Sequence, residues 1–181
     1  MTRRFLVITA LVAMCDVSIG QNQKPIEILG PVASGETPHL RVTAGASVAA
    51  ISPGMQFALV FDVTPMRNVH VYAPGKHTYQ IVNVDVASRS WLQVKPTSYP
   101  PSTIYHFKPL DERVAVYSKP FRLVRDLAIL STPAALKALA GRTSVLLDAT
   151  LEYQACDDTI CYMPQKVPLS WTLALKPSDG Q

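Results

Sequence analysis

Strand-length apolar segments, separated by turn-forming residues, run through most of this 181-residue chain. Residues 55–63 (MQFALVFDV) form an apolar run of strand length, and residues 79–86 (YQIVNVDV) alternate with a period of two. Similar segments cover residues 91–94, 113–117, 121–130, 143–153 and 167–175. The chain also holds fifteen prolines, a number more typical of a loop-rich β protein than of a helical one. The pattern predicts an all-β fold, in the form of a β-sandwich.

Three segments depart from the strand pattern. Thr132 is a candidate helix N-cap, followed by Pro133 at the first helical position and by an Ala/Leu-rich run that ends before Gly141. These residues predict a helix of one or two turns. We expect Ser34–Pro38 and Tyr99–Ser102 to be loops, because both are rich in turn-forming residues.

The amino terminus has the pattern of an export signal. Arg3 and Arg4 precede an apolar run over residues 5–14, and small residues at 18 and 20 place a cleavage site before Gln21. The apolar run is too short for a permanent membrane helix. We therefore expect residues 1–20 to be a signal peptide and residues 21–181 to form a single domain, with a core over about 25–176, in the periplasm.

A second interpretation of this leader involves Cys15. Residues 12–15 (VAMC) approach a lipoprotein processing site, in which Cys15 would be lipidated. Met14 is bulkier than the small residue that such sites prefer, so lipoprotein anchoring is the minor alternative. In either case Cys15 is not among the free thiols of the mature domain.

Two cysteines then remain, Cys156 and Cys161, with four residues between them. They lie near the turn of the last predicted hairpin, and a hairpin of this size can bring two Cβ atoms to disulfide distance. Exported proteins form and keep disulfides, commonly as structural staples. A loop this short yields only about 2 kcal/mol in the chain-entropy model, however. The spacing alone leaves a structural clamp and a redox-active pair both open.

Other function classes have weaker support in the sequence. The net charge is only +4, and no basic run exceeds two residues, which argues against nucleic acid or a polybasic membrane patch. We find no persuasive Ser-His-Asp order or carboxylate pair for a hydrolase. Trp91 and Trp171 fit core or hairpin packing better than a ligand-binding platform. Four histidines and two methionines are candidates for a copper site, but they lack compact metal-ligand spacing, and we interpret them as scattered surface residues. They are His39, His70, His77, His106, Met66 and Met163.

The segments around the two cysteines resemble the amino-terminal periplasmic domain family of the thiol–disulfide interchange protein DsbD. The resemblance rests on residues 153–156 (YQAC), 161–164 (CYMP) and 167–169 (VPL), with a weaker match at 70–75 (HVYAPG). The similarity in the order of the predicted strands extends over roughly residues 25–176. It implies an immunoglobulin-like β-sandwich that carries the cysteine pair on its last hairpin and needs no cofactor besides the redox-active disulfide.

The resemblance also implies roles for individual residues. Cys161 matches the cysteine that forms mixed disulfides with partners, and Cys156 matches the one that resolves them. Tyr72 matches a tyrosine that lines the site, and His70 stands where the family often has another tyrosine. Tyr162 follows Cys161 within the motif and is a further site-lining candidate.

A cap loop shields the disulfide in that family. The corresponding stretch here is residues 106–114 (HFKPLDERV), which lacks the family's adjacent aromatic pair. Phe107 and Leu110 are the candidate shields that remain.

The family also defines the expected partners. There, electrons pass from a membrane-embedded domain through a thioredoxin-like domain to this domain, and then to periplasmic disulfide oxidoreductases. This sequence contains neither of the first two, so a membrane-linked or thioredoxin-like thiol donor would be a separate protein. Whether the acceptor is an isomerase or serves cytochrome c biogenesis stays open, as does the direction of electron flow.

Asp157 and Asp158 lie between the cysteines and place negative charge beside them. Negative charge opposes thiolate formation, so we hypothesise that the free dithiol is a sluggish nucleophile until a partner docks. The alternative is that the two carboxylates only solvate a turn. Two other functions also stay open: a non-catalytic binding module with a structural hairpin disulfide, and a Cu(I) chaperone that uses both thiols with Met163.

Overall fold

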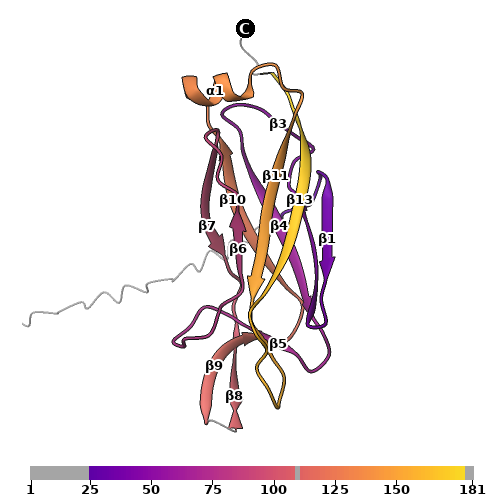
Figure 1. The fold of residues 1–181 in the computed structure, drawn as a ribbon, viewed down its shortest axis with the longest axis vertical. Helices are drawn as coiled ribbons and strands as arrows, with labels where there is room; N and C mark the ends of the chain where they lie inside the picture. The colour runs from indigo at the N-terminus through magenta and orange to yellow at the C-terminus, as the bar shows by residue number, and fades with distance from the viewer. Residues whose placement is uncertain (1–24, 109–110, 178–181) are drawn as a thin grey trace, which may run out of the picture.

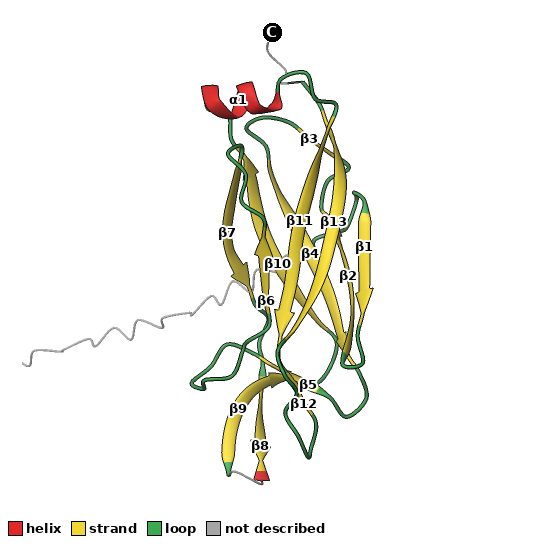
Figure 2. Cartoon of the chain, viewed as in Figure 1, coloured by secondary structure: helices red, strands yellow, loops and turns green. Residues whose placement is uncertain are grey.

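The computed structural model describes residues 25–108 and 111–177, and these residues form two sheets that pack face to face with a smaller third sheet at one end (Figures 1 and 2). The first sheet contains, in spatial order, β1 (Val32–Glu36), β2 (Leu40–Ala46), β4 (Gln56–Pro65), β10 (Phe121–Ile129) and β7 (Leu92–Ser98). The second contains β3 (Ala50–Ile51), β13 (Gln165–Leu175), β11 (Ser144–Tyr153) and β6 (Asn83–Val86). The third contains β12 (Ala155–Cys156), β5 (His70–Tyr72), β9 (Glu112–Tyr117) and β8 (Thr103–Phe107).

The strand order of the two large sheets is that of an immunoglobulin domain. The run β2-β4-β10-β7 corresponds to strands A, B, E and D, and the run β13-β11-β6 corresponds to strands G, F and C. All of these neighbours pair antiparallel. The prediction of an all-β, immunoglobulin-like β-sandwich is therefore confirmed.

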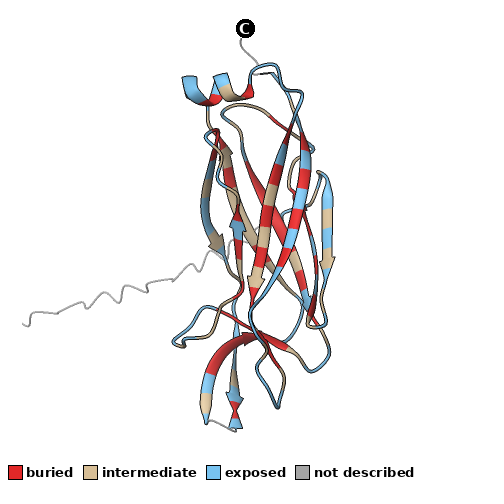
Figure 3. Cartoon of the chain, viewed as in Figure 1, coloured by how far each residue is buried: buried red, intermediate tan, exposed pale blue. Residues whose placement is uncertain are grey.

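The core lies between the two large sheets. Buried and more exposed positions alternate along β11 and β13, as the period-two pattern requires (Figure 3). Trp171 of β13 packs edge-on against Phe61 of β4, with ring centroids 5.9 Å apart. Its indole Nε1 donates a hydrogen bond to the carbonyl of Ala44 on β2, at 3.0 Å. Trp171 thus joins both sheets, and the prediction that it packs in the core is confirmed, as it is for Trp91.

A short helix covers the end of the sandwich opposite the third sheet (Figure 1). Helix α1 spans Pro133–Leu139, and the Thr132 hydroxyl accepts a hydrogen bond from the amide of Ala135 at 3.2 Å. Ala135 and Leu139 are buried against the sandwich core. The predicted N-cap, first residue and length of this helix are confirmed.

Two local predictions are wrong. Ser34–Pro38 was expected to be a loop, but residues 34–36 belong to the edge strand β1. This strand has small and polar side chains because it pairs only with β2, and Gly35 lets it approach β13: an added Cβ would lie 2.3 Å from Val167 Cγ1. Residues 79–82 do not continue the strand at 83–86, because Tyr79 turns toward the third sheet.

The third sheet is assembled from three connections between the strands of the sandwich. β5 follows β4, the β8–β9 hairpin connects β7 to β10, and β12 follows β11. β5 pairs with both β12 and β9. Three distant parts of the sequence therefore meet at this end of the molecule, and the two cysteines lie among them.

Candidate functional site

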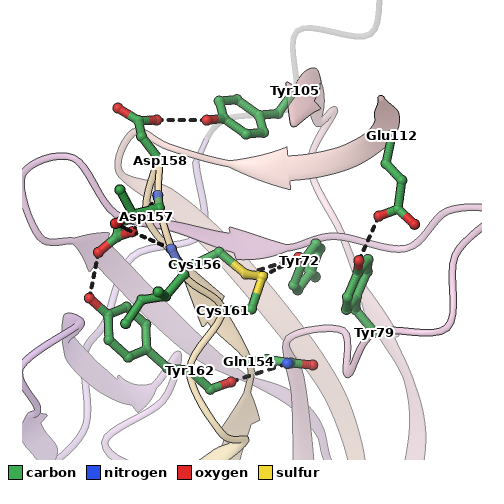
Figure 4. The surroundings of a disulfide bond; sticks show 12 residues. Tyr72, Tyr79, Tyr105, Glu112, Gln154, Cys156, Asp157, Asp158, Cys161 and Tyr162 are labelled. Atoms are coloured by element: carbon green, nitrogen blue, oxygen red, sulfur yellow. Dashed lines mark hydrogen bonds between the residues drawn. A yellow bond between two sulfur atoms is a disulfide. The ribbon is translucent and has the colours of Figure 1, made fainter. Parts of the chain in front are cut away.

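Cys156 and Cys161 form a disulfide in the connection between β11 and β13, as expected for the last hairpin (Figure 4). The amide of Asp157 donates to the carbonyl of Ile160 at 3.0 Å, and the amide of Tyr162 donates to the carbonyl of Ala155 at 2.8 Å. Cys156 and Cys161 are thus the non-hydrogen-bonded pair of a small antiparallel ladder, where facing side chains lie closest. Their Cα atoms are 4.1 Å apart.

The two cysteines differ in their access to solvent. Cys156 is completely buried, in a small cluster with Val114 and Val116 of β9. Cys161 is exposed. An incoming thiolate therefore has access to the Cys161 side of the disulfide.

Tyr72 of β5 contacts both sulfur atoms. Its Oη lies 2.9 Å from Sγ of Cys156 and 3.3 Å from Sγ of Cys161 (Figure 4). A disulfide sulfur carries no hydrogen, so the Tyr72 hydroxyl is the donor in both contacts. Burial, and then the neighbouring Tyr79 and Glu112, raise the pKa of Tyr72 above its ordinary range, so the hydroxyl stays protonated.

Tyr79 and Glu112 support Tyr72, and neither was predicted from the sequence as a residue of the site. The rings of Tyr72 and Tyr79 stack with centroids 4.2 Å apart and an angle of 4° between their planes. The Tyr79 hydroxyl donates to the Glu112 carboxylate at 2.5 Å (Figure 4). No local sequence signal marks these residues, because residue 79 lies in a loop and residue 112 comes from the β8–β9 hairpin.

His70 lies directly across the ladder from Cys156 and is only 4% exposed. The interpretation of this histidine as a surface residue is wrong, because its strand β5 lies between β12 and β9. Its ring packs on Tyr105 of β8 at a centroid distance of 4.3 Å. Burial lowers the pKa of His70, and the charges of Asp158 and Asp157 act in the opposite direction.

Asp157 organises the turn between the cysteines. One carboxylate oxygen accepts hydrogen bonds from the amide and hydroxyl of Thr159 and from the amide of Ile160, at 2.6–2.8 Å. The other accepts from the hydroxyl of Tyr162 at 2.6 Å (Figure 4). These bonds, led by that from the Thr159 side chain, hold the pKa of the Asp157 carboxyl well below its usual range. Asp157 is thus ionised. It stabilises the turn through these hydrogen bonds and also places negative charge beside the disulfide.

Asp158 is exposed and connects the turn to the β8–β9 hairpin. Its carboxylate accepts a hydrogen bond from the Tyr105 hydroxyl at 2.6 Å (Figure 4). Tyr105 also packs against the cluster that contains Cys156 and Tyr72. This tyrosine is a second aromatic residue of the site that the sequence analysis did not single out.

Tyr162 and Gln154 hold the base of the cysteine hairpin. The Tyr162 ring packs on His39 at a centroid distance of 4.2 Å. The Gln154 side chain donates to the carbonyl of Tyr162 and accepts from the amide of Gln80, both at 3.1 Å. The glutamine of the YQAC motif therefore ties the hairpin to the segment that carries Tyr79.

One of the two residues proposed for a cap, Phe107, lies on the β8–β9 hairpin. Phe107 is buried at the end of β8, and Leu110 lies outside the described residues. The aromatic residue of this hairpin that reaches the cysteine turn is Tyr105. A shielding role for Phe107 and Leu110 stays a prediction.

In residues 25–108 and 111–177, no three His, Cys, Asp or Glu side chains gather where they could hold a metal ion. Within the same residues no helix is long and apolar enough to cross a membrane. The predicted signal peptide and Cys15 lie outside the described part of the chain.

Comparison with known proteins finds similarity in structure alone. No family model and no curated protein matches the sequence. The N-terminal domain of DsbD from Neisseria meningitidis, in its reduced form, has a TM-score of 0.40 and 14% identity, over 81% of this chain and 94% of that one. The GAE domain of GGA2p from Saccharomyces cerevisiae has a TM-score of 0.42 and 7% identity, over 78% and 95%. At such TM-scores these likenesses assign neither a family nor a function.

Proposed function

We propose that this protein exchanges disulfides with partner proteins through Cys156 and Cys161, as a thiol–disulfide oxidoreductase that relays reducing equivalents in the periplasm. The observation that carries the proposal is the asymmetry of the disulfide, with Cys156 buried against Tyr72 and Cys161 exposed in the hairpin turn. This is the arrangement that one-sided attack by a partner requires.

The exchange proceeds in two balanced steps. A thiolate of the donor attacks Sγ of Cys161; the new intermolecular S–S bond forms, the Cys156–Cys161 bond breaks, and Cys156 receives the electron pair. A second thiolate of the donor then attacks the donor's sulfur in the mixed disulfide. The donor's own disulfide forms, and Cys161 leaves as a thiolate. The donor leaves oxidised, and the dithiol of this protein can reduce an acceptor disulfide by the reverse sequence.

The surface around Cys161 supports a protein partner. Ile160 and Met163, on either side of Cys161, are large apolar side chains that are 54% and 78% exposed. Apolar surface beside the point of attack can be covered by a docked protein. A membrane-linked or thioredoxin-like thiol donor and periplasmic disulfide oxidoreductases are the partners that we propose.

A structural clamp is the alternative, and the hairpin itself argues against it. The turn is already closed by the hydrogen bonds of Asp157, and its base by those of Gln154. A disulfide across a loop this short adds only about 2 kcal/mol in the chain-entropy model. A reduction potential below about −300 mV would favour the clamp, and a higher one the exchange reaction.

Trapping tests the proposal directly. Cys156→Ala leaves Cys161 without its resolving thiol, so mixed disulfides with exported proteins should accumulate at Cys161, as located by mass spectrometry. Cys161→Ala, the matched control, keeps only the buried thiol of the pair and should trap far less. Equal trapping by both variants, or none by either, would reject exchange through Cys161.

A further inference from the structure

The hydroxyl of Tyr72 is the one side-chain group in the described part of the chain that donates a hydrogen bond to either sulfur of the disulfide. The donor–sulfur distance is 2.9 Å for Cys156 and 3.3 Å for Cys161. The shorter contact is therefore made to the buried sulfur, which water cannot solvate.

This contact matters because attack on Cys161 puts negative charge on the other sulfur. Cys156 packs with Val114 and Val116, which carry no charge, and its cross-strand neighbour His70 has a pKa lowered by burial and adds no positive charge at neutral pH. The charged groups of the turn, Asp157 and Asp158, are both acidic and oppose the new charge. A thiolate at Cys156 therefore needs a donor, and among the side chains of residues 25–108 and 111–177 Tyr72 alone is in place.

We propose that Tyr72 is a catalytic hydrogen-bond donor for disulfide exchange, holding its hydroxyl on the Cys156 sulfur as that sulfur leaves the disulfide. This inference rests on the proposed function, because it assigns a role within the same reaction. The tyrosine keeps its proton throughout: the hydrogen bond shortens as charge develops on the sulfur, and the electron pair stays on Cys156.

Tyr79 and Glu112 act as positioning residues. The parallel stacking of Tyr79 limits rotation of the Tyr72 ring, and the Glu112 carboxylate fixes Tyr79 through its hydroxyl. Because Glu112 lies on the β8–β9 hairpin, this support is provided by a different connection of the sandwich from the one that carries the cysteines.

The first test measures the acidity of Cys156 in the reduced protein. In a Cys161→Ser background, the ¹³Cβ signal of Cys156 reports its titration. Tyr72→Phe should lower the acid dissociation constant of this thiol about tenfold, because a thiolate in a buried site loses its hydrogen bond. Tyr99→Phe, which removes a hydroxyl that donates to Asn83 outside the site and not to sulfur, should leave it unchanged.

The second test measures the reaction. Reduction of the disulfide by dithiothreitol should be severalfold slower in Tyr72→Phe than in the wild type, because a less acidic thiol leaves more slowly. Tyr79→Phe should slow it less. A folded Tyr72→Phe variant with wild-type acidity and rate would overturn the proposal.

A third variant keeps the proposal testable if Tyr72→Phe does not fold. Replacing Tyr72 with 3-fluorotyrosine retains the ring and makes the hydroxyl a stronger donor, so the acid dissociation constant of Cys156 should rise; no change would overturn the inference. These measurements need no protein partner. If they succeed while partner trapping fails, the exchange function is rejected and the donor role of Tyr72 stands.

Discussion

Cys156 and His70 occupy facing positions on β12 and β5, so the resolving cysteine of the proposed reaction has a buried imidazole as its cross-strand neighbour. The pKa of this imidazole is lowered, primarily by burial. At neutral pH His70 is therefore uncharged and adds no positive charge beside Cys156.

The first prediction concerns acid stability. A histidine with a lowered folded-state pKa binds protons more readily when unfolded, so stability is lost as pH falls below about 6.5, its unfolded value, toward the folded value. His70→Gln should remove this part of the pH dependence. Urea unfolding at pH 7.5 and 5.0 measures it; His106→Gln, at an exposed histidine of β8, is the control. An identical pH dependence in His70→Gln and the wild type would contradict the prediction.

The second prediction concerns the cysteine turn. Asp157→Ala removes the acceptor of four hydrogen bonds, so the amides of Thr159 and Ile160 should exchange with solvent faster than in the wild type. Asp157→Asn retains an acceptor oxygen and should have a smaller effect. Native-state hydrogen exchange followed by NMR distinguishes them, and unchanged exchange in Asp157→Ala would show that the backbone alone closes the turn.

The acid titration of Asp157 has the same sign as that of His70, because the folded-state pKa of both groups is lowered, but it falls in a lower pH range. Its folded-state pKa is depressed, so its contribution to stability is complete above the unfolded value of about 3.9 and is lost as pH falls below it. Asp157→Asn should therefore lose less stability than the wild type between pH 4 and pH 2. Urea unfolding across that range is the measurement, and equal losses would contradict the assignment.

The fourth prediction concerns the core. Trp171→Ala should destabilise the fold by about 3–5 kcal/mol, because it empties a large buried site between the two sheets. Leu146→Ala, on the neighbouring strand β11, changes a side chain that is 51% exposed and should cost no more than about 0.5 kcal/mol. Urea unfolding gives both values, and similar losses would contradict the packing described for Trp171.

The fifth prediction concerns partner docking. Ile160→Ser with Met163→Ser removes apolar surface beside Cys161 and should slow reduction by a thioredoxin-like protein, while leaving reduction by dithiothreitol unchanged. Leu136→Ser, at an exposed leucine of the distant helix α1, should affect neither rate. Equal slowing with both reductants would place the effect on the disulfide itself instead of on docking.

The sequence by itself determined the all-β architecture of the molecule, its short helix and the spacing of the two cysteines. Apolar periodicity within β4, β10, β11 and β13 is a local property, and so are the cap of α1 and the spacing of Cys156 and Cys161. A strand with one face in the core carries its pattern wherever it lies in the chain, and a hairpin pairs residues that are neighbours in sequence. These features were therefore predictable without coordinates.

Only the tertiary structure decided what surrounds the disulfide. β5, β8 and β12 are short segments without strong periodicity. Together with β9, which was predicted as a strand, they form a sheet only because the sandwich brings three of its connections to one end. That convergence buries His70 and Cys156, stacks Tyr79 on Tyr72 and brings Tyr105 to Asp158, while Cys161 stays exposed. Contacts between residues so far apart in sequence depend on the packed fold, because no local pattern encodes them.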